Sequence, residues 1–504
     1  MGALSFSLSE VLRIIAQENK VTSQALKTMV SLTPLASVLL LSLLILKGNS
    51  YKEILRLEVV TAMGVIASAP GQPTVARATA DNEILNDRRV ASTALLLGII
   101  IPVLFSTILL PVTKQVMNTL RCKLTIKYLS LQYLVSIFYS LSTSFYALAV
   151  EEQVKYVIGM VLPWASLVVP TLLIHKILGK HLTYSLLIST TISVIVELIL
   201  FYKFLYYPLE YERYGIIKHL RVAMCFAFDS LSLKLASTLY YSFLFADKIE
   251  WILLIGNDSL TIIKYAFIGS FPLIGGVLAG NAFWHSSGEL LSKAYKVTRI
   301  KLKIFKNKII KSFFSNIALA GLSSSIIANI VVLLETGYIN HYLFISMITY
   351  MITYMITKHR LYLVTILPII VVGDIIAFYA CTIEYWSIYD YILCSYSVVG
   401  IIGSSLIYIY SQLVGLKRET EAAALMGIPV VTAMGIDWIT GNPYLLPVGL
   451  ASGALVAKIL GTILLTVMYR ELDATILRVL AYNSMVSYLL EVKGVVPDLE
   501  EGGE

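Results

Sequence analysis

The stretch TMVSLTPLASVLLLSLLIL, residues 28–46, contains no charged side chain and is almost entirely apolar. A helix needs roughly 20 such residues to cross the hydrocarbon layer of a membrane, and this run is long enough. Backbone groups in lipid have no water to bond, so a run of this kind must satisfy its own hydrogen bonds as a helix. We therefore expect a transmembrane helix over residues 26–47.

Apolar runs of the same kind recur along the whole chain. They lie near residues 26–47, 54–78, 90–113, 124–149, 154–177, 182–205, 222–246, 259–283, 310–334, 340–357, 361–382, 389–414, 420–437 and 444–469. The composition agrees, because the 504 residues are 58% hydrophobic and only 14% charged, whereas soluble domains are about a quarter charged. The sequence predicts an all-α polytopic membrane protein with about fourteen transmembrane helices.

The most basic stretch fixes the expected orientation. Eight Lys or Arg and no acid occur between Lys293 and Lys311, after the eighth predicted span. Cytoplasmic connections collect Lys and Arg, so we place this stretch on the cytoplasmic side of the cell membrane. An even number of spans then puts both termini in the cytoplasm. The basic stretch 114–127 departs from the rule, since it falls on the outside in this scheme.

The basic residues between Lys293 and Lys311 recur near helical spacing, with apolar residues between them. This pattern predicts an interfacial helix over residues 289–311 that contacts anionic headgroups or anionic glycans. A solvated cytoplasmic linker is the alternative, and nucleic acid is disfavoured because no nucleic-acid-binding fold surrounds the run. The residues expected to make the contact are Lys293, Lys296, Arg299, Lys303 and Lys306.

Ionisable residues also occur inside the apolar runs, where they usually mark a pathway or pair with one another. Besides Lys264, Asp374 and Lys458, the sequence offers Asp247 in ADKIEW, which we place near the end of the seventh span, and Arg77 after the breakers Pro70 and Pro73. As a set, these charges predict a hydrophilic path through the helix bundle. We expect the following residues to line or gate it: Glu58, Arg77, Asp229, Lys234 and Asp247.

Several classes of function lack their motifs. The chain has no GxxxxGK[ST] phosphate loop and no HExxH metal motif, and its four cysteines are far apart without zinc spacing. We expect a transporter rather than an enzyme, with no cofactor or metal; a coupling ion such as H⁺ or Na⁺ stays open. Residues 1–25 are polar and charged, so we expect no cleaved signal peptide.

Five stretches resemble the PelG family, polysaccharide exporters of the MOP flippase superfamily. They are GALSFSLSEVLR (2–13), ARATADNEILNDRR (76–89), LYYSFLFADKIEWIL (239–253), YSQLVGLKRETEAAALMGIPVV (410–431) and LLTVMYRELDATILRVLAY (464–482). The family typically has twelve spans, so this chain departs from it by a surplus pair between about 340 and 382. The PelG family also has a longer charged segment after the eighth span than this chain has.

The resemblance implies two helical lobes that alternate between inward and outward openings. The lobes would be residues 1–206, with about six helices, and 219–470, with about eight, joined by the linker 207–218 and followed by a cytoplasmic tail, 471–504. The implied function is translocation of a polysaccharide or lipid-linked glycan, with membrane lipids and glycosyltransferase or synthase subunits as partners. Two alternatives remain: a cation-coupled multidrug antiporter, and a non-transporting component of a synthase complex.

Overall fold

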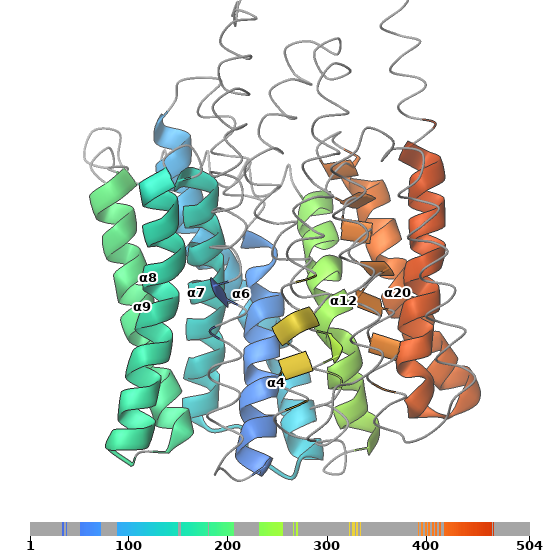
Figure 1. Ribbon diagram of the computed structural model, residues 1–504, viewed down its shortest axis with the longest axis horizontal. Coiled ribbons are helices and arrows are strands. Elements are labelled where there is room, and N and C mark those ends of the chain that lie inside the picture. Colours follow the sequence, from blue (N-terminus) through green and yellow to red (C-terminus); the bar gives the residue numbers. More distant parts are fainter. Residues whose placement is uncertain are drawn as a thin grey trace, which may run out of the picture.

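A computed structural model gives the fold of a large part of the chain. It describes residues 51–71, 88–149, 153–179, 181–205, 231–255 and 418–465, residue 467, and short pieces within 33–37, 266–270, 322–333 and 392–414. The elements in these residues are helices (Figure 1). Five of them are long and apolar enough to span a membrane: Leu97–Thr119, Val157–Ile177, Leu182–Leu200, Glu419–Thr440 and Pro443–Leu465. The predicted all-α polytopic fold is confirmed, whereas the total of about fourteen spans also involves residues outside this part.

The first group of helices comes from the N-terminal half. Its members are α4 (Tyr51–Ser68), α6 (Arg88–Thr119), α7 (Ile126–Ala149), α8 (Gln153–Leu172), the π-helical turn η1 (Leu173–Ile177) and α9 (Leu182–Leu205). Short connections make α6, α7, α8 and α9 successive antiparallel neighbours. The helix α4 packs against α6 and α7, and α8 packs against α9.

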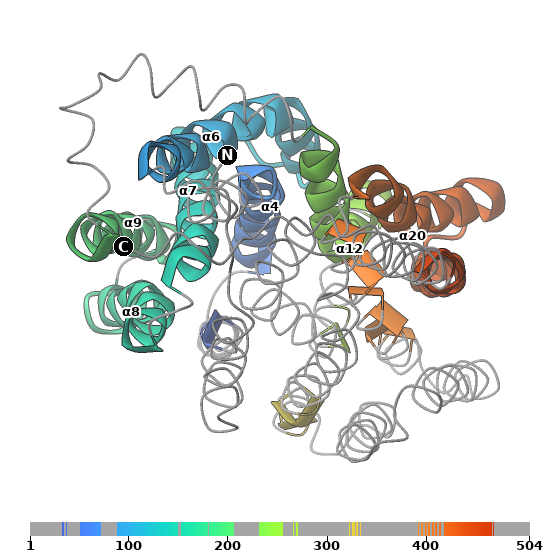
Figure 2. The ribbon, with the colours of Figure 1, turned by 90° about the horizontal axis from the view of Figure 1, so that it is seen from above.

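The second group consists of α12 (Leu231–Ile255), α20 (Glu419–Thr440), the short 3₁₀ turn η5 (Pro443–Leu445) and the helix that follows it. We call residues Pro443–Leu465 the C-terminal span. Seen from above, α12 lies between α4 on one side and α20 on the other (Figure 2). The predicted lobe boundary at 206–219 lies outside the described residues and stays a prediction.

The regular part of α4 ends where proline interrupts it. The sequence predicts a span over 54–78 with Pro70 inside it, but α4 ends at Ser68. Ala69 N donates to Ile66 O at 3.2 Å, which closes a tighter final turn. Proline has no N–H to continue the ladder, and the residues after Gly71 lie outside the described part.

The helix α12 continues beyond its expected end. The apolar run predicts a span over 222–246, which would leave Asp247 and Lys248 near its end, but the helix continues to Ile255. Trp251 and Ile252 are buried beyond the charges, so packing continues past the predicted end of the span. The prediction was wrong because it ended the span at charged residues, which this helix buries and pairs.

Close packing of two helices in the second group depends on glycine. Gly449 and Gly453 lie four residues apart on the C-terminal span, in the GxxxG arrangement that lets membrane helices approach. A Cβ on Gly449 would lie 2.8 Å from Ala433 Cα, and one on Gly453 would lie 2.7 Å from Pro429 Cα. Both obstructing atoms belong to the backbone of α20, so neither can rotate away.

We expect Gly453→Val to destabilise the protein by about 1–3 kcal/mol, the usual cost of overpacking a tight interface. The measurement is thermal unfolding of the purified protein in detergent. Gly435→Val on α20 is the matched control, because a Cβ there meets no atom within 4 Å. Equal stability of the two variants would show that the glycine contact does not hold these helices together.

Candidate functional site

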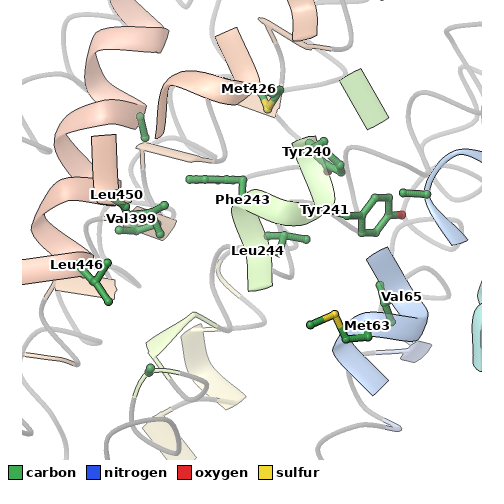
Figure 3. Packing of buried hydrophobic residues seen from close by; sticks show 14 of the residues in the cluster. Met63, Val65, Tyr240, Tyr241, Phe243, Leu244, Val399, Met426, Leu446 and Leu450 are labelled. Atoms are coloured by element: carbon green, nitrogen blue, oxygen red, sulfur yellow. The ribbon is translucent and has the colours of Figure 1, made fainter. Parts of the chain in front are cut away.

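The helix α12 contacts both groups of helices through opposite faces. Tyr241 points toward α4, where Met63 and Val65 lie, while Phe243 points the other way, toward Val399 and Leu450 (Figure 3). These side chains belong to one continuous buried cluster. The polar residues on α12 therefore lie where the two groups of helices meet.

A hydrogen bond joins α12 to α4 at one end of this contact. Ser237 Oγ donates to Ala69 O at 2.9 Å, in buried surroundings. Next to it, the Tyr240 ring stacks on Tyr410, with ring centroids 4.9 Å apart. At this end of the contact, one buried hydrogen bond therefore lies next to a pair of stacked aromatic rings.

A buried ion pair occupies the other end of the contact. Lys248 Nζ lies 3.4 Å from both carboxylate oxygens of Asp247 and donates to Leu244 O at 2.9 Å. Tyr396 OH donates to Asp247 Oδ2 from a neighbouring segment, and the ammonium also lies 5.1 Å from the Tyr396 ring centroid. Because buried charges are costly without partners, these contacts explain how α12 carries both charges inside the bundle.

The same end of α12 is fixed to the second group by an aromatic side chain. Trp251 Nε1 donates to Pro443 O at 2.7 Å, at the turn between α20 and the C-terminal span. Its indole also meets the Tyr396 ring edge to face, with centroids 6.1 Å apart. The ion pair is thus held on a rigid support.

Further carboxylates lie near this ion pair. Glu58 on α4 attracts the ammonium from the first group of helices. Glu250, one turn from Asp247, feels repulsion from both Asp247 and Asp437 on α20. Lys248 therefore interacts with Asp247 and Glu58, while Glu250 and Asp437 bring two more carboxylates to this end of α12.

The structure brings together only part of the predicted path. Glu58 and Asp247 meet through Lys248. Lys234 is buried on the same helix, but it lies fourteen residues before Lys248, about 20 Å along the axis. The remaining predicted residues lie outside the described part of the chain: Arg77, Asp229, Lys293, Lys296, Arg299, Lys303 and Lys306.

The sequence interpretation missed or misplaced three residues with buried polar roles. Lys248 was noticed but assigned to a helix end, because the span was expected to stop before it. Tyr396 is 149 residues from Asp247, and nothing in the sequence marks that pairing. Glu197 was overlooked although it lies inside the apolar run 182–205, and an ionisable residue there was a usable signal.

Glu197 occupies the interior of the first group. It is fully buried on α9 and lies beside Ser142 of α7. Neither of its carboxylate oxygens meets a described donor with normal hydrogen-bond geometry. Ser193, one turn earlier, accepts from Ser166 Oγ on α8 at 3.1 Å, so small hydroxyl side chains from three helices lie around this region.

Sequence comparisons give no family, but structural comparisons give the fold. No protein-family model matches the sequence, and no curated protein matches it significantly. A MATE protein crystallised with MaD5 is similar over 90% of this chain and 96% of its own, with a TM-score of 0.55 and 15% identity. A MATE crystallised with MaL6 gives 0.51 and 14% identity, over 90% and 95% of the two chains.

An inward-facing multidrug resistance MATE family transporter of the MOP superfamily is also similar. Its TM-score is 0.50 at 14% identity, over 87% of this chain and 99% of that one. At these identities the similarity concerns the fold. This chain therefore has the fold of MATE transporters of the MOP superfamily, and the finer resemblance to the PelG family stays a prediction.

We expect Lys248→Met to destabilise the protein by about 3–5 kcal/mol, because it leaves the Asp247 carboxylate buried without its cation. The double variant Asp247→Asn/Lys248→Met should recover most of this loss, since both charges are then removed. Thermal unfolding in detergent measures the four members of the cycle.

The control for this cycle is the pair Arg418–Glu421. Its atoms are 3.0 Å apart, but the side chains are 52% and 33% exposed, so Arg418→Gln should cost less than about 1 kcal/mol. Additive effects of the Asp247 and Lys248 substitutions would contradict a coupled pair.

Proposed function

We propose that this protein is a membrane translocase for anionic polysaccharide or lipid-linked glycan that works by alternating access between two helical lobes. The fold supports a transporter, because proteins with this fold include a multidrug resistance transporter captured in an inward-facing conformation. The contact of α12 with α4 on one side and α20 on the other supports a division into two lobes. The transported material follows from the charges.

Buried lysines are the observation that carries the choice of cargo. Lys234, Lys248 and Lys458 are each at most 6% exposed within helices of the second group. Ionisable residues at membrane depth usually face the bundle interior or a pathway. A bundle whose interior contains ammonium groups suits an anionic polymer better than a cationic drug, and the net charge of +8 agrees.

A cation-coupled multidrug antiporter is the second candidate. Its support is a set of carboxylates at one end of α12. Glu58 and Asp247 interact with Lys248, and Glu250 is repelled by Asp247 and Asp437. Carboxylates of this kind attract cations, and one of the similar structures is a multidrug resistance transporter. Substrate competition separates the two candidates.

We expect proteoliposomes containing this protein to take up a fluorescent uronic-acid oligosaccharide and not a lipophilic cationic dye. Lys234→Gln should lower oligosaccharide uptake about tenfold, and Lys234→Arg should retain it, because the buried positive charge is the feature that matters. Arg418→Gln, at an exposed helix end, is the control. Uptake of the dye alone would favour the antiporter and overturn this proposal.

Glu197 is our candidate for the site of a coupling ion, H⁺ or Na⁺. Burial makes an isolated carboxylate anion costly, and the described polar group beside this one is the uncharged hydroxyl of Ser142, so Glu197 has reason to bind a proton or a cation. We expect an imposed H⁺ or Na⁺ gradient to stimulate uptake severalfold in the natural protein and not in Glu197→Gln.

Glu53→Gln is the control for this experiment, because Glu53 already accepts from Thr183 Oγ1 at 2.7 Å at the end of α4. Gradient-stimulated uptake that survives in Glu197→Gln would remove this residue from the coupling mechanism and leave the cargo proposal untouched.

A further inference from the structure

Two connections of the first group meet at one end of the bundle. They are the turn between α6 and α7, residues 120–125, and the connection between η1 and α9, residues 178–181, both at the lower end in Figure 1. Lys127 Nζ lies 4.0 Å from the ring centroid of Tyr184, which brings the two together. The start of α4 supports both, since Arg56 Nε donates to Cys122 Sγ at 2.6 Å and Glu53 accepts from Thr183.

This end of the first group is strongly basic. Lys114, Arg121, Lys123 and Lys176 are exposed, and Lys127 is partly exposed; we call these five residues the basic end. Among the described side chains at this end the acid is Glu53, and the amide and hydroxyl of Thr183 already bind its carboxylate. The described part of the protein therefore compensates little of the positive charge of the basic end.

One of these cations is held at a strained position. Arg121 has φ of 52° and ends α6 in the left-handed conformation, with Arg121 N donating to Asn118 O at 2.8 Å and Cys122 N to Met117 O at 2.9 Å. Helices that end this way usually place glycine or asparagine there. The chain instead has an arginine there, whose Cβ makes the left-handed conformation costly, and this favours a role for its exposed charge.

Exposed apolar side chains lie among the cations. Ile126, Ile177 and Leu178 are 79%, 72% and 63% exposed, and the span Val157–Ile177 ends at this level. Isoleucine and leucine at a span end can enter the acyl region while neighbouring Lys and Arg reach the phosphates. A polysaccharide would offer these apolar side chains no comparable partner.

We propose that the basic end, Lys114, Arg121, Lys123, Lys127 and Lys176, binds the phosphate headgroups of anionic phospholipids. The arrangement combines exposed cations, exposed apolar side chains among them, and a backbone fixed to α4. This lipid site is separate from the cargo path and does not depend on what the protein transports.

The test compares lipid-dependent stability of the full-length protein in detergent with phosphatidylglycerol or phosphatidylcholine added. We expect phosphatidylglycerol to raise the unfolding temperature by several degrees more than phosphatidylcholine, and 0.5 M NaCl to reduce the difference by screening. In Arg121→Gln/Lys123→Gln/Lys176→Gln the apparent affinity for phosphatidylglycerol should fall on the order of 100-fold, since each cation near an anionic surface contributes a factor of about five.

The matched control removes three cations from the opposite helix ends, as Arg88→Gln/Arg89→Gln/Arg418→Gln, because α6 begins at Arg88 and α20 follows Arg418. It should keep the phosphatidylglycerol effect. Arg121→Gly is a second variant that relieves the strained φ, so it should be at least as stable as the natural protein without lipid and should bind phosphatidylglycerol more weakly.

Three outcomes would overturn the proposal. They are an equal effect of the two lipids on the natural protein, an unchanged phosphatidylglycerol effect in the triple variant, and stabilisation of the natural protein by a soluble anionic oligosaccharide but not by phosphatidylglycerol. The last outcome would assign the basic end to glycan instead. Native mass spectrometry of retained lipids gives an independent measure of the same binding.

Discussion

A charge buried in a membrane helix must find its partners within the protein, and this constraint governs the helix on which both groups pack. Asp247 and Lys248 are 2% and 6% exposed on α12, where neither water nor lipid can compensate them. The protein replaces the hydration that these two charges lose. Tyr396 donates a hydrogen bond to Asp247, Leu244 O accepts one from Lys248, and Glu58 attracts the ammonium. These partners come from different segments, so pairing the charges also fixes how the segments are arranged.

Away from this ion pair, most contacts between the described helices are close and apolar. Helices in lipid gain little from hydrophobic burial against one another, so packing and small residues must hold them together. Gly449 and Gly453 bring the C-terminal span against the backbone of α20, and Trp251 then bonds the turn that joins the two. The ion pair on α12 therefore rests on a tightly packed support.

The sequence could predict the class of fold because each apolar run carries its own evidence of a span. It could also single out Glu58, since a charge inside such a run is conspicuous, and Asp247 as a charge at the end of one. It could not predict that Tyr396 pairs with Asp247, because nothing local relates residues so far apart in the chain. The end of α12 was misplaced for a related reason: hydropathy treats Asp247 and Lys248 as breaks, whereas the helix pairs and buries them.

The two contacts between α4 and α12 bear on the alternating access that we propose. Ser237 bonds Ala69, and eleven residues later along α12 Lys248 attracts Glu58, which is eleven residues earlier on α4. The helices are thus antiparallel, and the two contacts lie about 16 Å apart. A rocking motion that opens one end separates one contact and keeps the other as a pivot. A buried hydrogen bond contributes about 1 kcal/mol, which is comparable to the few kcal/mol that separate populated conformations. In the proposed transport cycle, a hydrogen bond of this strength between Ser237 and Ala69 would stabilise one opening without trapping the protein in it.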